Sequence, residues 1–152
     1  MRVYLPTFAE LVDRLSIVIL KSIFIPENKE AYEKEQGLIM HDIDEILKEQ
    51  ENLIDDPGYF VARGINAKMI RAMMIVMLTN RYIWENESKA RLGGSEQDTL
   101  LKLTHSINGI RNTAKNVLSQ EMGERVDLKI DALAAELTAE FGNWNLFKKE
   151  WL

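Results

Sequence analysis

Proline is scarce in this chain, and its three prolines, at positions 6, 26 and 57, each fall where a helix is expected to begin or end. Thr7 and Glu10 have the spacing of a capping box, so a first helix is expected to start at Thr7 and to stop before Pro26. Pro26 then opens a second helix, because proline is tolerated in a first helical turn. That helix is expected to reach residue 54, where an Asp-Asp-Pro-Gly turn follows.

Glycines and polar caps divide the remaining chain into three further predicted helices. Apolar residues recur with a helical period over residues 66–92, 95–122 and 127–141, and these segments end at Gly93-Gly94, Gly123 and Gly142. Strand signals are nearly absent. The sequence therefore predicts an all-α fold, a single-domain antiparallel bundle of four to five long helices over residues 1–142. Residues 143–152 form an aromatic tail that we expect to dock on the bundle or on a partner.

Composition excludes several classes of function. The 152-residue chain has no cysteine, which rules out disulfides and thiolate chemistry and favours a reducing cytoplasm. No apolar run approaches the ~20 residues that span a bilayer, and the first residues do not have the pattern of a signal peptide. The net charge is −5 and no Lys/Arg-rich block occurs, so we expect neither a membrane nor long nucleic acid as a partner. A small anion remains compatible, because a few focused cations can hold one inside an acidic protein.

Two cations lie within the apolar stretch of the first predicted helix. Arg14 and Lys21 are seven residues apart, so they fall almost on one line along the helix. In a structural interpretation, Arg14 pairs with Glu10 one turn earlier and Lys21 extends outward to water. In a functional interpretation, both cations meet the charge of a bound anion.

A row of hydrogen-bond donors lies beside the apolar stripe of the fourth predicted helix. An ordinary solvated face mixes glutamate with lysine, whereas this row contains no carboxylate. Asparagine is also a middling helix former, so its repeated use here indicates a purpose beyond helix propensity. The row favours ligand binding, and it comprises Thr104, His105, Asn108, Arg111, Asn112, Lys115 and Asn116.

Asn80 and Trp84 lie one turn apart on the third predicted helix. The tryptophan can stack on a planar base, and the asparagine can hydrogen-bond to the edge of that base. The structural alternative is a core tryptophan beside an asparagine that makes an internal polar contact. Upstream methionines form a soft stripe suited to core or dimer packing: Met69, Met73, Met74 and Met77.

Three segments, LVDRLSIVILK, NRYIWENESKAR and HSINGIRNTAKN, resemble the motifs of uncharacterised small helical proteins. With them, the whole chain is similar to small conserved proteins of T4-like bacteriophages. The resemblance implies no activity, but it places Asp13 in the same recognisable segments as the candidate residues. It also implies the host cytoplasm as the location. By analogy with small phage proteins that sequester the host's nucleotide immune signals, it implies a sequestration role.

The leading hypothesis is a binding module for a small phosphorylated ligand, a nucleotide or cyclic nucleotide signal, with no catalytic residue and no cofactor. Arginine and lysine would meet the phosphate charge, the amides and the histidine would orient the ligand, and the tryptophan would stack on a base. The candidate ligand-binding residues are Arg14, Lys21, Asn80, Trp84, His105, Asn108, Arg111 and Lys115.

Two alternatives stay open. In the first, the chain resembles the all-α nucleoside triphosphate pyrophosphohydrolases and is a Mg²⁺-dependent enzyme whose metal ligands are Glu30, Glu33, Asp42 and Glu45. In the second, it is a non-catalytic interaction or assembly protein that uses the methionine-rich helix and the aromatic tail. We expect a homodimer under every hypothesis, because long helical hairpins with spare apolar surface commonly pair by two-fold symmetry.

Overall fold

A computed structural model describes residues 4–52, 64–95 and 97–126, and these ranges contain helices and no strand, which confirms the all-α prediction. The helices are α1 (Phe8–Phe24), α2 (Lys29–Asn52), α3 (Ala67–Arg91) and α4 (Gln97–Glu121). A short 3₁₀ turn, η1 (Pro26–Asn28), leads directly into α2. The predicted turn at 55–58, the helix at 127–141 and the tail at 143–152 lie outside the described residues.

Local hydrogen bonds fix the helix ends that the sequence predicts. Thr7 Oγ1 accepts the Glu10 N–H at 3.2 Å, and Glu10 Oε2 accepts the Thr7 N–H at 2.7 Å, so the capping box is formed. Asn66 caps α3, because its side-chain oxygen accepts the Met69 N–H at 2.9 Å. Gly123 follows α4 with a φ of 66°, a left-handed conformation that glycine adopts readily.

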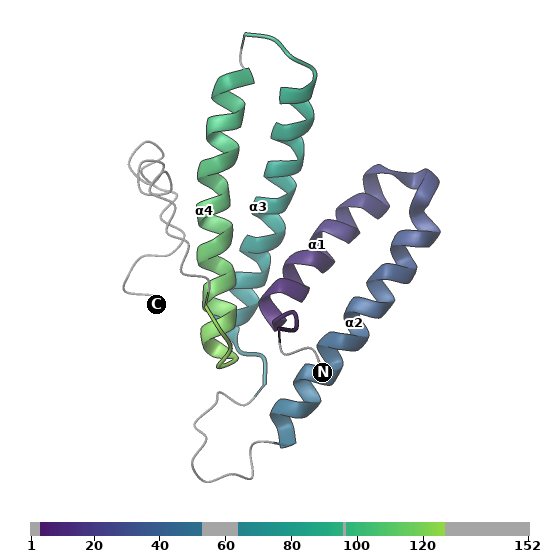
Figure 1. Ribbon diagram of the computed structural model, residues 1–152, viewed down its shortest axis with the longest axis vertical. Helices are drawn as coiled ribbons and strands as arrows, with labels where there is room; N and C mark the ends of the chain where they lie inside the picture. The colour runs from purple at the N-terminus through teal and green to yellow at the C-terminus, as the bar shows by residue number, and fades with distance from the viewer. Residues whose placement is uncertain (1–3, 53–63, 96, 127–152) are drawn as a thin grey trace.

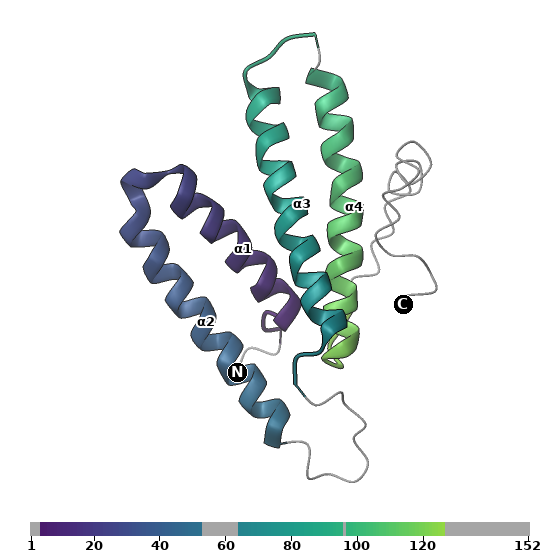
Figure 2. The same cartoon turned by 180° about the vertical axis from the view of Figure 1, so that it is seen from behind.

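The described fold consists of two helical hairpins, α1 with α2 and α3 with α4 (Figures 1 and 2). α1 lies in the middle, since it packs against α2 on one side and against α3 and α4 on the other. In the described ranges α2 packs mainly on α1, and its second half also reaches the end of α4, where Gln50 Nε2 donates to the Met122 carbonyl oxygen at 2.8 Å. The upper parts of α3 and α4 extend beyond the first hairpin in both views.

Two apolar clusters hold the hairpins together. The larger one fills the junction of α1, α3 and α4, and its buried members include Phe8, Met69, Val76, Ala114 and Leu118. The smaller one joins α1 to α2 and contains Leu11, Val18 and Ile39. α1 thus buries two faces, and polar side chains on either face need partners on the neighbouring helices.

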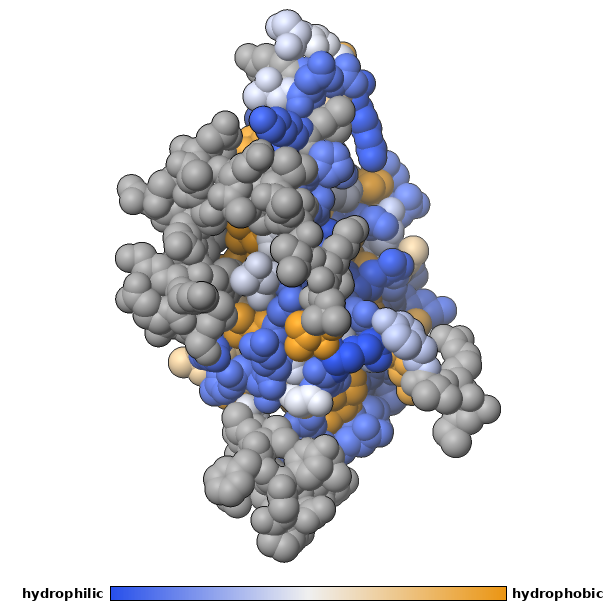
Figure 3. Space-filling model, turned by 60° about the vertical axis from the view of Figure 1, so that its left-hand side comes forward, coloured by the Kyte–Doolittle hydropathy of each residue, from blue (hydrophilic) through white to orange (hydrophobic). Residues whose placement is uncertain are grey.

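Hydrophilic residues cover most of the described surface seen in Figure 3, where hydrophobic residues form small separate patches. Such a surface agrees with the acidic net charge of −5. Among the described residues, no helix combines the length and the apolar character needed to cross a membrane.

Candidate functional site

Asn80 lies at the centre of a polar network that joins α1, α3 and α4. Its side chain is only 3% exposed, and its Nδ2 donates to Asp13 Oδ1 at 2.7 Å and to Ser16 Oγ at 2.6 Å. Its Oδ1 accepts a hydrogen bond from Arg111 Nη1 at 2.8 Å. The three partners use all the donor and acceptor groups of the amide, which fixes the orientation of the side chain. The three segments recognised in the sequence therefore meet at one buried point.

Lys115 extends this network toward the surface. Its Nζ lies 3.0 Å from Asp13 Oδ2, and the two side chains are 22% and 13% exposed. Asp13 therefore receives one bond from the amide of Asn80 and one from the ammonium group of Lys115. Because a single carboxylate faces the cations Arg111 and Lys115, the network carries one positive charge in excess.

Two buried polar atoms beside the network have no hydrogen-bond partner among the described residues. They are Arg111 Nε, a donor, and Asn108 Oδ1, an acceptor, and they belong to side chains three residues apart on α4. Buried polar groups are nearly always hydrogen-bonded in folded proteins. Within the described residues, one N–H donor of Arg111 and the side-chain oxygen of Asn108 therefore lack the hydrogen bonds that burial normally requires.

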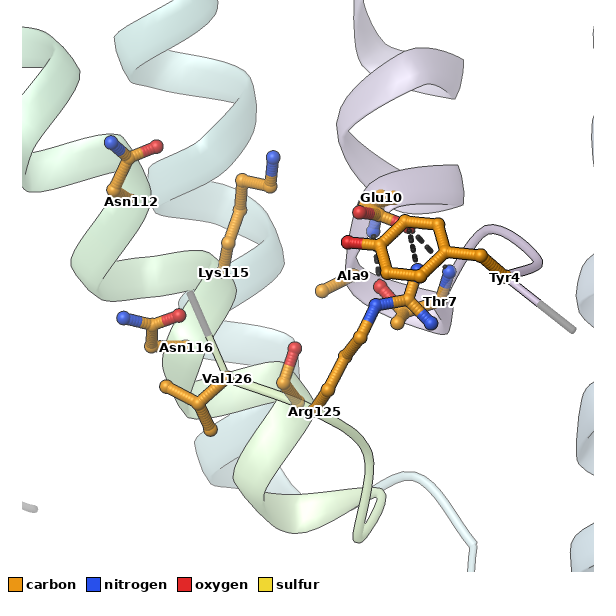
Figure 4. A pocket seen from close by; sticks show the side chains of 10 residues that line it. Tyr4, Thr7, Ala9, Glu10, Asn112, Lys115, Asn116, Arg125 and Val126 are labelled. Carbon is orange, nitrogen blue, oxygen red and sulfur yellow. Dashed lines mark hydrogen bonds and ion pairs between the residues drawn. The ribbon is translucent and has the colours of Figure 1, made fainter. Parts of the chain in front are cut away.

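A cavity of about 370 Å³ opens between the first turn of α1 and the last half of α4 (Figure 4). Lys115 is shared by the network and the cavity, so the two form one continuous polar region. Figure 4 shows Asn112, Lys115 and Asn116 on the α4 side and Tyr4, Thr7 and Glu10 on the α1 side, with Arg125 reaching between them. The remaining wall is formed by Ala9, Ser119 and Val126.

Arg125 ties the end of α4 to the start of α1. Its guanidinium carbon lies 3.8 Å from the centroid of the Tyr4 ring, a cation–π contact. Its Nη2 donates to the Leu5 carbonyl oxygen at 2.6 Å and to Glu10 Oε2 at 3.1 Å. The sequence interpretation missed this residue, since only the Gly123 stop signalled a turn, and nothing in the sequence showed that the turn returns to α1.

The neighbouring Glu124 fixes the same junction from inside. Both of its carboxylate oxygens accept the Phe8 N–H, at 2.8 and 3.1 Å, at the positive end of the α1 dipole. Burial raises the pKa of the Glu124 carboxyl above its ordinary value, because desolvation outweighs the backbone hydrogen bond from Phe8. Glu124 and Arg125 together form one wall of a second cavity of about 350 Å³, which Thr7 also lines.

The other predicted ligand-binding residues are not brought to this region. Arg14 does not pair with Glu10 as the structural interpretation expected, because Arg14 points to α2, where its Nη2 lies 2.6 Å from Glu35 Oε1. Lys21 Nζ lies 5.9 Å from the centroid of the Tyr32 ring, also on α2.

Trp84 and His105 do not line the cavity between α1 and α4 and do not belong to the polar network around Asn80. The Trp84 ring stacks on Phe24 with 6.0 Å between centroids, so it occupies the seam between α1 and α3. His105 is exposed on α4. Of the eight candidates, Asn80, Arg111 and Lys115 share the network, and Asn108 lies beside it.

The four carboxylates of the metal hypothesis are exposed along α2. Asp42 lies twelve residues beyond Glu30, which is about 18 Å along a helix. Glu33 pairs with Lys29 at 3.5 Å, and Glu45 pairs with Lys48 at 2.8 Å. Over the described ranges, no three histidine or acidic side chains gather closely enough to hold a metal ion. One chain therefore does not bring these four ligands around one Mg²⁺.

Compared with protein-family models, with curated proteins and with solved structures, the chain has no match.

Proposed function

We propose that this chain binds a small phosphorylated ligand of the nucleotide class in the cavity between α1 and α4. The observation that carries the proposal is the pair of cations, Lys115 and Arg125, on the walls of one cavity of about 370 Å³. A volume near the lower end of the range of small-molecule pockets suits a ligand of mononucleotide size.

Both cations keep hydrogen-bond donors beyond the bonds described above. An ammonium group has three N–H donors, and Asp13 accounts for one donor of Lys115. A guanidinium group has five, and the bonds of Arg125 to Leu5 and Glu10 both leave from Nη2. The remaining donors are of the kind that binds phosphate oxygens, which accept several charge-assisted hydrogen bonds at once.

The charge distribution supports the same class of ligand. The network and the cavity wall hold three cations, Arg111, Lys115 and Arg125, against two carboxylates, Asp13 and Glu10. This positive excess lies inside a chain whose net charge is −5. Local focusing of positive charge of this kind attracts small anions without attracting long nucleic acid.

The polar groups between the cations suit the uncharged part of a nucleotide. Asn112 and Asn116 place two amides on the α4 wall, and Thr7 and Ser119 add hydroxyl groups. Amides can donate and accept at once, as recognition of a base edge or a sugar hydroxyl requires. We propose that the ligand is held and not transformed, and that sequestration of a nucleotide signal in a phage-infected host is the biological role.

The cavity borders the point where the described residues end. The described chain ends at Val126, on the wall of the cavity. Residues 127–141 have the apolar spacing of an amphipathic helix. We propose that the chain forms one antiparallel bundle of four to five long helices, as the sequence predicts.

A thermal-shift screen of nucleoside mono-, di- and triphosphates and cyclic dinucleotides tests the function. A ligand present at one hundred times its dissociation constant adds about 2.7 kcal/mol of stability. For a domain of this size, that corresponds to a rise in Tm of roughly 5–11 °C. Failure of every compound to raise Tm at millimolar concentration would contradict the proposal.

Calorimetric titration of variants then locates the binding site. Lys115→Met and Arg125→Gln should each weaken binding at least tenfold, because each removes a cation from the cavity wall. Arg14→Gln is the matched control, since Arg14 pairs with Glu35 on another face and should leave the affinity unchanged. Equal losses in all three variants would indicate non-specific charge attraction and would refute the site.

A further inference from the structure

Tyr4 lines the cavity between α1 and α4 with one face of its ring covered and the other open. The guanidinium carbon of Arg125 lies 3.8 Å from the ring centroid, a distance that requires it to lie over the face of the ring. Tyr4 is nevertheless 74% exposed, so the described residues leave the second face open. An open aromatic face therefore borders the same cavity as the two cations of the proposed site.

The exposed ring is held in a fixed orientation by its neighbours. Arg125 Nη2 donates to the carbonyl oxygen of Leu5, the residue after Tyr4, at 2.6 Å, and to Glu10 Oε2 at 3.1 Å. Glu10 is fixed in turn, because the same oxygen accepts the Thr7 N–H of the capping box at 2.7 Å. A ring that is ordered before binding loses little conformational entropy when another group stacks on it.

The chemistry of the open face favours a flat, uncharged group. A second cation would be attracted only weakly, because the Arg125 guanidinium on the opposite face already interacts with the electron density of the ring. A phosphate group would be repelled by the negative face of the ring. A nucleobase meets neither obstacle, and every base has a π-face that can stack on an aromatic side chain.

We propose that the base of the bound nucleotide stacks on the open face of Tyr4, while its phosphate lies at Lys115 and Arg125. This inference rests on the function proposed above and narrows its ligand class, because it makes the aromatic base a required part of the ligand. Tyr4 then separates nucleotides from sugar phosphates and inorganic phosphate, which the two cations alone cannot do. Purines should bind more tightly than pyrimidines, since their larger rings cover more of the tyrosine face.

The sequence interpretation gave this stacking role to Trp84. The Trp84 ring stacks on Phe24 instead, and among the described residues Tyr4 is the one aromatic side chain on the cavity wall. With the base on the α1 side, the amide of Asn112 on the α4 side is placed to meet the sugar hydroxyls (Figure 4).

Calorimetric titration with three probes tests the inference: adenosine monophosphate, guanosine monophosphate, and ribose phosphate, which has the same sugar and phosphate without a base. The natural chain should bind both mononucleotides about fivefold or more tightly than ribose phosphate. Tyr4→Leu should remove this preference and keep the affinity for ribose phosphate, because Arg125 retains its bonds to Leu5 and Glu10. Tyr4→Phe should preserve the preference, since it retains the ring.

Tyr32→Leu is the matched control. Tyr32 also has a cation over its ring, with Lys21 Nζ 5.9 Å from the centroid, but it lies on α2 and does not line the cavity. This variant should bind all three probes as the natural chain does.

Nuclear magnetic resonance of the natural chain gives a readout that needs no loss of the ring. Adenosine monophosphate should shift the ring-proton signals of Tyr4 upfield through the ring current of the stacked base, and ribose phosphate should not. The Tyr4→Phe spectrum assigns these signals. Unmoved Tyr4 signals at saturating adenosine monophosphate would overturn the inference.

The outcomes separate this inference from the proposed function. Equal affinities for adenosine monophosphate and ribose phosphate, or a Tyr4→Leu variant that keeps the preference, would overturn the stacking role and leave the phosphate site in place. Absence of binding by both mononucleotides would also overturn it. The proposed function itself fails only if no nucleotide of the thermal-shift screen raises Tm.

Discussion

Replacing Asn80 by alanine removes three hydrogen bonds at the point where α1, α3 and α4 meet. Two of them join charged groups, Asp13 and Arg111, and the third joins the Ser16 hydroxyl. Hydrogen bonds to charged groups contribute about 1.5–3 kcal/mol each and neutral ones about 1 kcal/mol. The losses overlap, since Asp13 keeps its ion pair with Lys115. We therefore expect Asn80→Ala to lower the free energy of unfolding by about 4 kcal/mol.

Urea denaturation followed by circular dichroism measures this loss. For a domain of this size, about 4 kcal/mol corresponds to a decrease in Tm of roughly 8–16 °C. Asn112→Ala is the matched control, because Asn112 lies on the cavity wall and outside the network, so its removal should cost under about 0.5 kcal/mol. If Asn80→Ala cost less than about 1 kcal/mol, the polar network would add little to the apolar clusters that hold the two hairpins together.

Two further substitutions test the junction between α1 and the end of α4. Thr7→Ala removes the Oγ1 acceptor of the capping box and should lower the free energy of unfolding by about 1 kcal/mol, measured by urea denaturation at neutral pH. An unchanged urea midpoint of unfolding would mean that water satisfies the Glu10 N–H in place of the threonine hydroxyl. Glu124→Gln keeps an acceptor for the Phe8 N–H and removes a carboxyl whose folded-state pKa is raised by burial above the ordinary 4.5. The folded chain then binds the Glu124 proton more tightly than the unfolded chain, so the stability of the natural chain relative to the variant should fall as the pH rises from 4.5 through the raised pKa. A relative stability that rises over this range would contradict the assigned direction.

The helix boundaries could be predicted because their causes are local. Thr7 with Glu10, Asn66 with Met69, and the turn at Gly123 act within a few residues of the helix ends that they fix. Sequence patterns carry such short-range chemistry directly. What the helices pack against depends instead on contacts between distant segments.

The sequence predicted the members of the network on α3 and α4, Asn80, Arg111 and Lys115, but not the members on α1. Asp13 and Arg14 are adjacent, so they point about 100° apart around the helix. Asp13 faces α3 and α4, whereas Arg14 faces Glu35 on α2. Because α1 is buried on two faces, both residues border apolar positions, and the sequence does not tell which faces which neighbour. The sequence pattern led to the prediction that Arg14 binds the ligand, whereas the structure shows that Asp13 makes the hydrogen bonds and the ion pair of the network.

The cavity could not be predicted from spacing. Arg125 and Tyr4 are separated by nearly the whole described chain, and their contact exists only because the turn after Gly123 returns the chain to α1. The donor row on α4 was a more useful signal. Three of its members, Asn112, Lys115 and Asn116, do line the cavity wall.

The central position of α1 also determines the order in which the helices can detach during partial unfolding. α2 is attached to the remaining helices mainly through α1, and beyond it only its second half reaches the main core and the end of α4, where Gln50 donates to the Met122 carbonyl oxygen. Most of α2 can therefore detach while the junction of α1, α3 and α4 stays closed. Loss of α1 releases α2 with it and opens the main core. A short glycine-containing connection joins α3 to α4, so this hairpin can re-form quickly. Re-docking of α1 is slower, because it needs contacts between distant segments, such as that of Asp13 with Asn80, 67 positions apart. Amide protons of α2 should therefore exchange with solvent earliest, and those in the α3–α4 seam should exchange last.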